Sequence, residues 1–333
     1  STYTRSRAGA PCGGGCQPGP GVGRGPPRGG PMGPVRNLIF RLWTGAQGTL
    51  GIMTKMCVQI LPFIEDRKIF FITFTDLKEA IEPIKKIQRK EIGMESFLLN
   101  SFNLAALLSN EWDVPELFPV NPRPSETFEQ LRTSLPPWVL AVCIRGGPRR
   151  PEEKIAFEGK ALREVCQNLN LELKEDLPPV SGLDQILMHE ILYPWGILKK
   201  FHYRGSVHTL HFKSPLMDIV KMDSVITKIC EEEGYDRASV GSYFLPLERG
   251  RAVHCEFDLH CDLQDADETE RVKNLYFKVS EALMNQGACF DRAYGAWADM
   301  VYRSSGSYTE KLREIKVEMD PHGIMNPGKL CFG

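Results

Sequence analysis

The sequence has 333 residues, of which 42% are apolar and 25% charged, and its formal net charge is −1. Such a composition is typical of a globular chain with one or two domains, and the balanced charge argues against nucleic acid or an anionic membrane as a partner. No long uncharged apolar run and no apolar leader occurs, so we expect neither a membrane span nor a signal peptide. The ten cysteines are scattered, which favours reduced thiols and a cytoplasmic protein.

The first 35 residues differ in composition from the rest of the chain. Eighteen of them are Gly or Pro, and the first acidic residue of the chain is Glu65. So little apolar surface cannot offset the entropy of ordering, which predicts a disordered or loosely attached tail. The alternative is that this tail replaces part of a domain that should precede residue 36. Cys12 and Cys16 have no second pair nearby and are weak support for a zinc site.

The rest of the chain has the pattern of a folded domain. Alternation predicts a strand over 52–61, and an apolar run predicts another over 68–74. Further predicted elements are strand 138–145, helix 152–169, strand 206–213, helix 215–233, strands 238–245 and 251–261, helix 267–287 and helix 307–319. This succession predicts an α+β fold in which helices back an antiparallel sheet.

A further helix follows the strand over 68–74. Asp76 can cap its start with Glu79 as the capping-box partner, and Gly93 can end it. Pro83 falls inside this helix and predicts a kink or a late start.

Two glycine-bearing turns lie near the two ends of the folded part. In GAQGTLGIMTK, residues 45–55, a glycine recurs every three residues, so the backbone can approach a flat ring or a phosphate closely. In DPHGIMNPGKL, residues 320–330, Asn326-Pro327-Gly328 forms a turn and Lys329 follows as a fixed cation. Alone, the first segment is as compatible with a purely structural turn as with a ligand site, and the second is more typical of a C-terminal turn with a solvated lysine.

Together, these segments resemble those of a known family. GAQGTLGIMTK resembles the G-[ST]-x-G-T-L-G-I-[VM]-T signature of FAD-linked oxidases, and DPHGIMNPGKL is similar to their closing D-P-x-x-I-x-N-P-G-K. The resemblance, over residues 36–333, is to the C-terminal portion of the superfamily of vanillyl-alcohol oxidase and p-cresol methylhydroxylase. It implies FAD as the cofactor, contacted by Gly45, Gly48, Thr49, Gly51, Ile52, Thr54, Asn326 and Lys329.

The resemblance also implies a domain organisation. After the tail 1–35, residues 36–66 correspond to a fragment of the second half of a PCMH-type FAD-binding domain. Residues 67–290 correspond to a cap or substrate domain, and residues 291–333 return to the flavin domain. Nothing in the tail resembles the pyrophosphate loop of the family's first half-domain, so we expect this chain by itself to bind FAD weakly or not at all.

A third motif, FDRAYGAWAD at residues 290–299, places Arg292 seven residues before Asp299. In the vanillyl-alcohol oxidase branch, a Tyr-Arg pair followed seven residues later by Asp lies near the flavin. The resemblance implies that Arg292 lies beside the flavin N1–C2 carbonyl or a substrate anion, where it would stabilise negative charge. Asp291 stands where the family has tyrosine, so a surface ion pair with Arg292 is the alternative.

A fourth motif, GRAVHCEFDLHCD at residues 250–262, combines polar and apolar alternation. In a strand, His254, Glu256, Asp258 and His260 share one face and the cysteines share the other. The polar face can line a cavity with His254 or Glu256 as general base, or it can simply be a solvated face. Thiols on the opposite face argue against a mixed His/Cys zinc site.

The segment RGSVHTLHF, residues 204–212, is related to a metal-binding pattern. Relatives that oxidise 2-hydroxy acids carry H-x-G-D-G-N-x-H, of which His211 matches the second histidine, but Arg204 replaces the first. The D-G-N core is absent, so we expect no metal site. His208 and His211 fall on opposite faces of a strand. Tyr243 and Tyr294 are further candidates for orienting a substrate.

These motifs favour an FAD-dependent oxidoreductase. The hypothesis is that it oxidises an alcohol, a hydroxy acid or a para-hydroxybenzylic carbon by hydride transfer to flavin N5, with Arg292, His254, Glu256 and Tyr294 as catalytic residues. Electrons would pass to a separate flavoprotein, iron–sulfur or cytochrome subunit, and a homo-oligomer is left open. Two alternatives remain: a non-catalytic subunit whose cap domain is an interaction surface in a redox complex, and a redox-neutral flavoenzyme like alkylglycerone-phosphate synthase.

Overall fold

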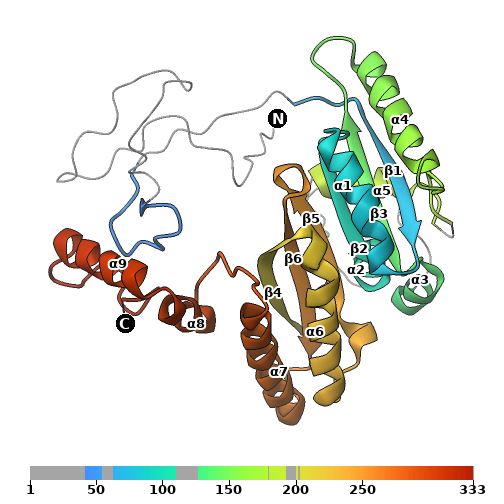
Figure 1. Ribbon diagram of the computed structural model, residues 1–333. Coiled ribbons are helices and arrows are strands. Elements are labelled where there is room, and N and C mark those ends of the chain that lie inside the picture. The colour runs from blue at the N-terminus through green and yellow to red at the C-terminus, as the bar shows by residue number, and fades with distance from the viewer. Residues whose placement is uncertain are drawn as a thin grey trace. The chain divides into compact units, whose positions relative to one another are not determined.

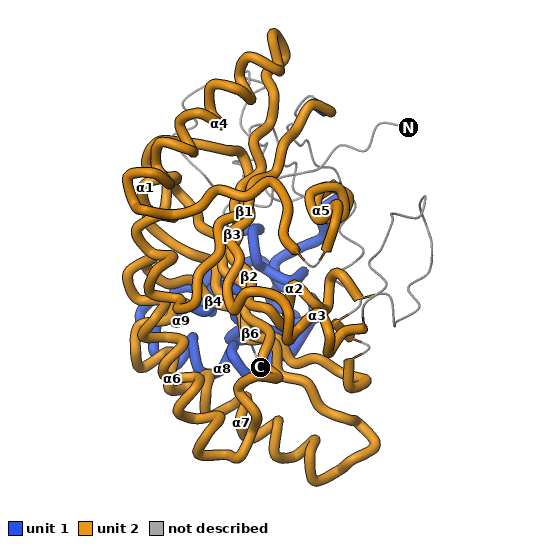
Figure 2. Tube along the Cα trace, turned by 90° about the vertical axis from the view of Figure 1, so that its right-hand side faces the viewer, with its two compact units in different colours: residues 1–63, 290–333 blue, residues 64–289 orange. Residues whose placement is uncertain are grey.

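The structure is a computed structural model that describes residues 42–54, 63–109, 127–178, 180–192, 200–201 and 203–332. These residues form two compact units, one of residues 64–289 and one that joins the chain before residue 64 to residues 290–332 (Figure 2). The tail, Cys12, Cys16 and most of the strand predicted over 52–61 lie outside the described residues, and residues 52–54 have no regular secondary structure.

The larger unit is built on a six-stranded antiparallel sheet with the order β1-β3-β2-β5-β6-β4 (Figure 1). The strands are β1 Arg67–Phe74, β2 Glu95–Asn100, β3 Trp138–Arg145, β4 Ser206–Pro215, β5 Gly241–Leu247 and β6 Ala252–Cys261. The strand β3 is a continuous apolar run that is buried on both faces, whereas β6 alternates between apolar and polar residues. The antiparallel sheet predicted from the sequence is confirmed.

The sheet contains an internal structural repeat. Apart from α2, α3 and α5, which are additions to the first half, each half runs strand, helix, strand, strand, helix, with its third strand in the middle: β1, α1, β2, β3, α4 and β4, α6, β5, β6, α7. The helices of the repeat are α1 Ile81–Arg89, α4 Pro151–Gln167, α6 Ile219–Glu232 and α7 Ala266–Asn285. The halves join where β2 pairs with β5, at Leu98–Phe244 and Leu99–Tyr243.

The two faces of the sheet are covered differently. Helices α1, α4, α6 and α7 cover one face, and α2 Ser101–Leu108, α3 Phe128–Ser134 and α5 Leu183–Leu192 lie on the other (Figures 1 and 2). On that second face, a core that includes Phe71, Phe102, Leu131, Val139 and Leu187 is fully buried against the first half of the sheet. On the same face, strands β4 and β6 in the second half of the sheet carry polar side chains instead.

The first helix begins later in the chain than the sequence predicts. Asp76 and Glu79 form the expected capping box, but a 3-10 turn over Leu77–Ala80 precedes α1. Pro83 therefore falls in the first turn of α1, where its missing N–H would have had no helical partner. The helix ends at Arg89, before the predicted end at Gly93.

Several elements differ from the sequence-based expectation. The strand expected over 238–245 is β5, which begins later because Asp236 caps a 3-10 turn over Arg237–Ser239. The elements β2, α2, α3, α5 and α8 Ala296–Ser304 had not been predicted. The final helix, α9 Gly306–Met319, begins one residue before its expected start.

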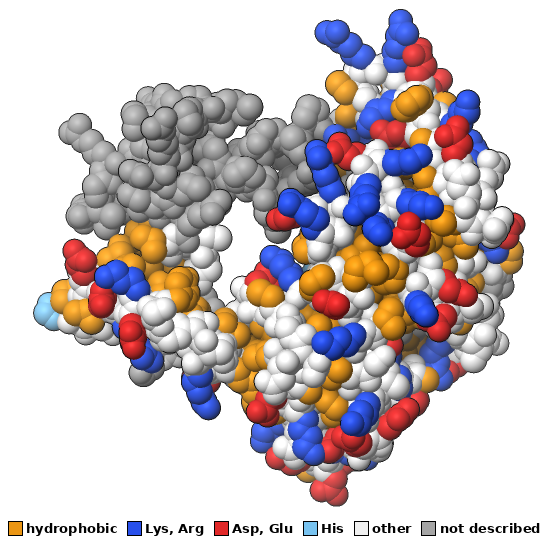
Figure 3. Space-filling model, in the orientation of Figure 1, with side chains coloured by type: hydrophobic (Ala, Val, Ile, Leu, Met, Phe, Trp, Pro, Cys, Tyr) orange, Lys and Arg blue, Asp and Glu red, His pale blue; other side chains and the backbone are white. Residues whose placement is uncertain are grey.

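The surface of the described residues is mixed in charge. Figure 3 shows Lys and Arg side chains interspersed with Asp and Glu over the face of the larger unit that is in view, without a patch of one sign there. Across the described ranges, no helix combines the length and apolar character needed to cross a bilayer. The seven described cysteines are free thiols, and all but Cys289 are buried.

Candidate functional site

The two glycine-bearing turns meet within the smaller unit. The Asn326 side-chain amide donates a hydrogen bond of 2.5 Å to the carbonyl oxygen of Gln47. The Lys316 ammonium, from α9, donates to the carbonyl oxygens of Thr49, at 2.7 Å, and Met325, at 2.9 Å. Segments from the two ends of the folded chain therefore form one junction, as the sequence resemblance had led us to expect.

The first turn owes its shape to glycines and one buried hydroxyl. Gly45 and Gly48 have φ of 83° and 73°, in the left-handed region that glycine tolerates best, and Gln47 shares it with φ 51°. The Thr49 hydroxyl donates to the carbonyl oxygen of Ala46 over 2.6 Å and is buried. The Thr49 N–H donates to the same carbonyl oxygen at 2.9 Å and the Thr49 carbonyl accepts from Lys316, so Thr49 shapes the turn and has no free group for the ligand contact that the sequence predicts.

The segment after this turn packs against Trp43 at Gly51 and is exposed to solvent from Ile52 onward. A Cβ atom on Gly51 would lie 2.7 Å from the Trp43 ring, so a larger residue there would displace the ring. Ile52 and Thr54 are exposed, with 71% of the Ile52 surface accessible. Both side chains are therefore accessible to a ligand.

The second turn is fixed by a buried ion pair. The Asp320 carboxylate accepts hydrogen bonds from the backbone N–H groups of Ile324 and Met325, at 3.1 and 2.8 Å, and pairs with Lys316. The hydrogen bond from Lys316 lowers the pKa of Asp320. Lys316 is thus the buried cation of the junction, whereas the side chain of Lys329 is exposed.

Arg292 and Tyr294 flank the same junction. The Gln47 side-chain amide lies 3.5 Å from the carbonyl oxygen of Ala293, between them in sequence, and a tight turn is closed by the Tyr294 N–H and the Arg292 carbonyl at 2.9 Å. Both side chains are exposed, and the Arg292 guanidinium has no ion pair with any described residue. The arginine is therefore available to an anionic ligand.

A second candidate surface lies on the larger unit. The pairing register places Glu256 of β6 opposite His211 of β4 and Tyr243 of β5. Directly opposed residues share a face, so these side chains lie on the same face as His254 and Asp258. The His254 ring lies 6.4 Å, between centroids, from both His211 and Tyr243.

A buried lysine organises this polar face. The Lys200 ammonium contacts Glu256 at 2.5 Å and both carboxylate oxygens of Asp258 at 3.1 Å. The Thr209 hydroxyl donates to Asp258 over 2.6 Å, and His254 Nε2 lies 3.7 Å from Glu256. Asp258 has no exposed surface, so it supports the site without reaching a ligand.

The two carboxylates of this cluster, Glu256 and Asp258, have pKa values that shift in opposite directions. Burial alone would raise the pKa of Glu256, but the His254 hydrogen bond and the Lys200 charge lower it to about 2. Burial raises the pKa of Asp258 against the opposing effect of Lys200. With one ammonium between two carboxylates, Glu256 carries the negative charge. So weak a base accepts protons poorly at neutral pH, which argues against Glu256 as the general base.

His260, the fourth residue of the predicted polar face, belongs to the core. Its ring lies 5.2 Å, between centroids, from both Phe102 and Tyr203, and its Nδ1 lies 3.3 Å from the Ser206 carbonyl oxygen. Its Nε2 is buried and has no hydrogen-bond partner among the described residues, and burial lowers its pKa to about 4. His260 is therefore a neutral packed histidine.

His208 and His211 of β4 do not share a face. His208 lies on the opposite face of β4 from His211, and its Nε2 is 3.5 Å from the Cys261 sulfur. In the part of the chain that the structure describes, no group of three or more His, Cys, Asp or Glu side chains could hold a metal ion.

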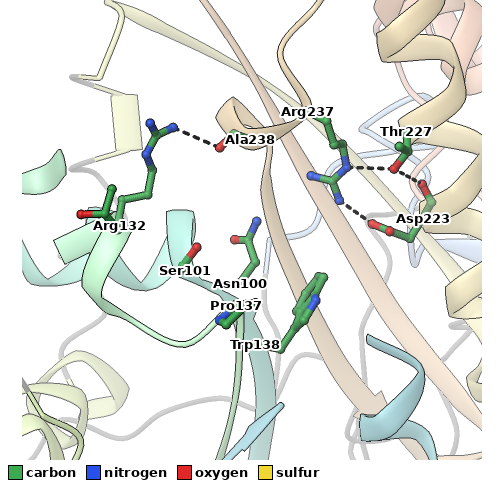
Figure 4. A pocket seen from close by; sticks show the side chains of 10 residues that line it. Asn100, Ser101, Arg132, Pro137, Trp138, Asp223, Thr227, Arg237 and Ala238 are labelled. Carbon is green, nitrogen blue, oxygen red and sulfur yellow. Dashed lines mark hydrogen bonds and ion pairs between the residues drawn. The ribbon is translucent and has the colours of Figure 1, made fainter. Parts of the chain in front are cut away.

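A separate open cleft of about 520 Å³ lies where the two halves of the sheet join (Figure 4). Its polar side chains bind one another or the backbone: Arg237 pairs with Asp223 and Thr227, and Arg132 donates to the carbonyl oxygen of Ala238. Asn100 bridges the halves through the Ser242 N–H and the Val240 carbonyl. These bonds join the two halves of the sheet, and they leave few polar groups of the cleft free to bind a ligand.

Comparisons with solved structures identify the fold. The chain is similar to p-cresol methylhydroxylase with substrate bound, with a TM-score of 0.66 and 18% identity over 86% of this chain. It is also similar to 4-ethylphenol oxidase from Gulosibacter chungangensis in complex with isoeugenol, with a TM-score of 0.67 and 19% identity over 86% of this chain. Alkyldihydroxyacetonephosphate synthase matches with a TM-score of 0.52 and 12% identity over 84% of this chain.

These three neighbours are members of the FAD-linked oxidase superfamily, so the described chain has the fold of that superfamily and the resemblance predicted from its sequence is confirmed. The match covers 56%, 57% and 47% of the three neighbouring chains, so this chain spans about half their length. No protein-family profile and no curated protein sequence matches it.

Two residues of these sites had not been predicted. Lys200 lies 56 residues before Glu256 in the chain, and no local pattern connects them. Lys316 carried a weak signal, since its spacing of four residues before Asp320 suits an ion pair on a helix.

Proposed function

We propose that this chain is part of an FAD-dependent oxidoreductase. The observation that carries the proposal is the junction of the turn over residues 45–51 with the turn at Asn326. The superfamily fold supports it, because the neighbours named p-cresol methylhydroxylase and 4-ethylphenol oxidase act on phenols by name. The oxidised group is an alcohol, a hydroxy acid or a para-hydroxybenzylic carbon.

The junction fits the polar edge of a flavin. The backbone N–H groups of Leu50, Gly51 and Asn326 have no hydrogen-bond partner within the described residues. A Cβ atom at Gly45 would have no other atom within 4 Å, so there is open space beside the first glycine of the turn. Free donors beside open space suit the carbonyl and nitrogen acceptors of the ring. When bound, FAD would supply the two-electron acceptor.

The exposed cations of the smaller unit have a defined role in this proposal. Arg292 and Lys329 provide positive charge for the anionic form of the flavin or for an anionic substrate. Tyr294 orients the substrate. The lack of an ion-pair partner for Arg292 among the described residues supports its assignment.

The polar face of the larger unit provides the substrate-side chemistry. His254 accepts the proton from the substrate hydroxyl, and the Glu256 carboxylate 3.7 Å away stabilises the protonated imidazole. Lys200 keeps Glu256 ionised, so that the charge beside His254 is permanent. Electrons then pass to a separate acceptor, for which an electron-accepting protein subunit is our proposal.

An anaerobic titration tests this function. Because the chain by itself is expected to bind FAD weakly or not at all, the test uses the full-length protein, which should take up FAD and become yellow, and an oxidisable 4-alkylphenol or hydroxy acid should bleach the flavin absorbance. Full-length protein that takes up no added FAD would contradict the proposal. Arg292→Ala should slow bleaching, and Arg303→Ala, an exposed arginine on α8, is the matched control.

A redox-neutral flavoenzyme is the second candidate. The similarity to alkyldihydroxyacetonephosphate synthase supports it, with the lower TM-scores of 0.52 and 0.53. In that case, the flavin would remain oxidised after turnover, and no external acceptor would be consumed. Stopped-flow absorbance distinguishes the two, because only the oxidoreductase accumulates reduced flavin without an acceptor.

A further inference from the structure

Lys316 has all of its hydrogen-bonding capacity used inside the junction. Its ammonium donates to the Thr49 carbonyl, the Met325 carbonyl and the Asp320 carboxylate, so its three protons have three acceptors. The residue is only 8% exposed, although it lies on an otherwise solvated helix. A buried cation without spare protons cannot itself contact a ligand.

The carbonyl groups that Lys316 binds determine where the neighbouring amides point. In a trans peptide, the C=O and the following N–H point in opposite directions. The Thr49 carbonyl is directed to Lys316, so the Leu50 N–H is directed away from it, and the Met325 carbonyl does the same for the Asn326 N–H. Neither N–H has a partner within the described residues.

The two amides come from distant parts of the chain, which the side chains of Lys316 and Asn326 join by hydrogen bonds among the described residues. The Leu50 peptide follows the glycine turn, and the Asn326 peptide follows α9. Asp320 fixes the second peptide from the other side, through the N–H groups of Ile324 and Met325. One ammonium thus sets the orientation of two donors that are far apart in sequence.

We infer that Lys316 is a positioning residue, which orients the Leu50 and Asn326 N–H groups toward the flavin through the Thr49 and Met325 carbonyls. The inference rests on the proposed function for the identity of the ligand. It assigns the positioning role to a buried lysine that never touches the cofactor, and it separates that role from the exposed Lys329.

The test compares Lys316→Met with Lys311→Met. Methionine keeps the length of the side chain and removes the charge. Lys311 lies on the same helix but is exposed and pairs with Glu314 at the surface. Flavin fluorescence quenching should show that Lys316→Met weakens FAD binding by about tenfold, the order expected when a well-oriented donor is lost, while Lys311→Met binds like the wild type.

A second readout does not depend on FAD. In the folded Lys316→Met variant without ligand, the amide resonances of Leu50 and Asn326 should shift and their hydrogen exchange should accelerate, whereas in Lys311→Met they should not. A purely structural lysine would lower the unfolding temperature but leave these resonances and the FAD affinity of the folded protein unchanged, which would overturn the inference.

The outcomes separate the inference from the proposed function. If the wild type binds no FAD but the two amides respond to Lys316→Met, the flavin proposal fails and the positioning role remains. If Lys316→Met does not fold, Asp320→Asn replaces it, because asparagine keeps an acceptor oxygen while removing the charge that holds Lys316. Wild-type amide resonances in Asp320→Asn would then overturn the inference.

Discussion

Asn326 and Gln47, 279 residues apart in the chain, are joined by a 2.5 Å hydrogen bond from the asparagine side chain to the glutamine carbonyl. Both residues have positive φ, 41° and 51°, which costs energy for any residue other than glycine. Two such residues in direct contact are typical of functional sites, where the surrounding structure holds a strained backbone in place.

Two substitutions of Asn326 distinguish the energetic cost of its positive φ from the stabilisation that its hydrogen bond to Gln47 provides. Asn326→Ala should lower the free energy of unfolding by about 1–2 kcal/mol, because it loses the bond to Gln47 and keeps a side chain at positive φ. Asn326→Gly loses the same bond but relieves the backbone, so it should be more stable than the alanine variant. Urea denaturation measures both, and an alanine variant as stable as the glycine variant would contradict this account.

The close approach of Gly51 to Trp43 predicts a strict requirement for glycine. In Gly51→Ala the new methyl group would lie 2.7 Å from the indole ring, so the free energy of unfolding should fall by about 1–3 kcal/mol. Gly306→Ala, at the start of α9 with no atom within 4 Å of the new Cβ, is the control and should be neutral or slightly stabilising. Equal denaturation midpoints for the two variants would exclude the contact.

Lys200 should be essential for the stability of the polar face. Lys200→Met leaves the Glu256 and Asp258 carboxylates without their cation, which should cost about 3–5 kcal/mol at neutral pH. The double variant with Asp258→Asn should recover part of this loss, since one buried carboxylate is removed. Lys221→Met, on the exposed surface of α6, should change stability by less than about 0.5 kcal/mol. Additive effects of the two substitutions would show that the cluster is not coupled.

Buried His260 predicts a loss of stability in acid. Its folded-state pKa is about 4, below the ordinary value of 6.5, so the unfolded chain binds the proton more readily. Its contribution is therefore present above pH 6.5 and is lost as the pH falls toward 4, by about 3 kcal/mol. His260→Phe should flatten the difference in unfolding free energy over this range. Parallel pH profiles for the wild type and the variant would refute the assignment.

The strands with strong patterns could be predicted from the sequence. The alternation of β6 identified its polar face, and the apolar run of β3 gave its bounds to the residue. Helix α2 could not be recognised, because it is apolar on nearly every side and has no helical periodicity. Helix α3 is only seven residues long, too short for its periodicity to stand out.

The candidate sites were predicted only in part, for a related reason. Glycine spacing and turn residues mark Gly48 and Asn326 locally, but which carbonyl meets which cation depends on the tertiary fold. Lys200 reaches Glu256 and Asp258 only once the segment before β4 packs on the sheet. The sequence analysis singled out Lys329 and did not consider Lys316, because proximity to the turn is visible in a sequence and burial is not.

Chemical-shift mapping by NMR with added FAD tests most directly whether the two turns form a flavin site. In the deuterated full chain, the amide resonances of Gly48, Leu50, Gly51 and Asn326 should show the largest changes as FAD is added, even when binding is weak. Lumiflavin, which lacks the phosphates, should shift the same amides, because the junction contacts the ring. Shifts that are absent at millimolar flavin, or that are confined to residues 64–289, would contradict the account.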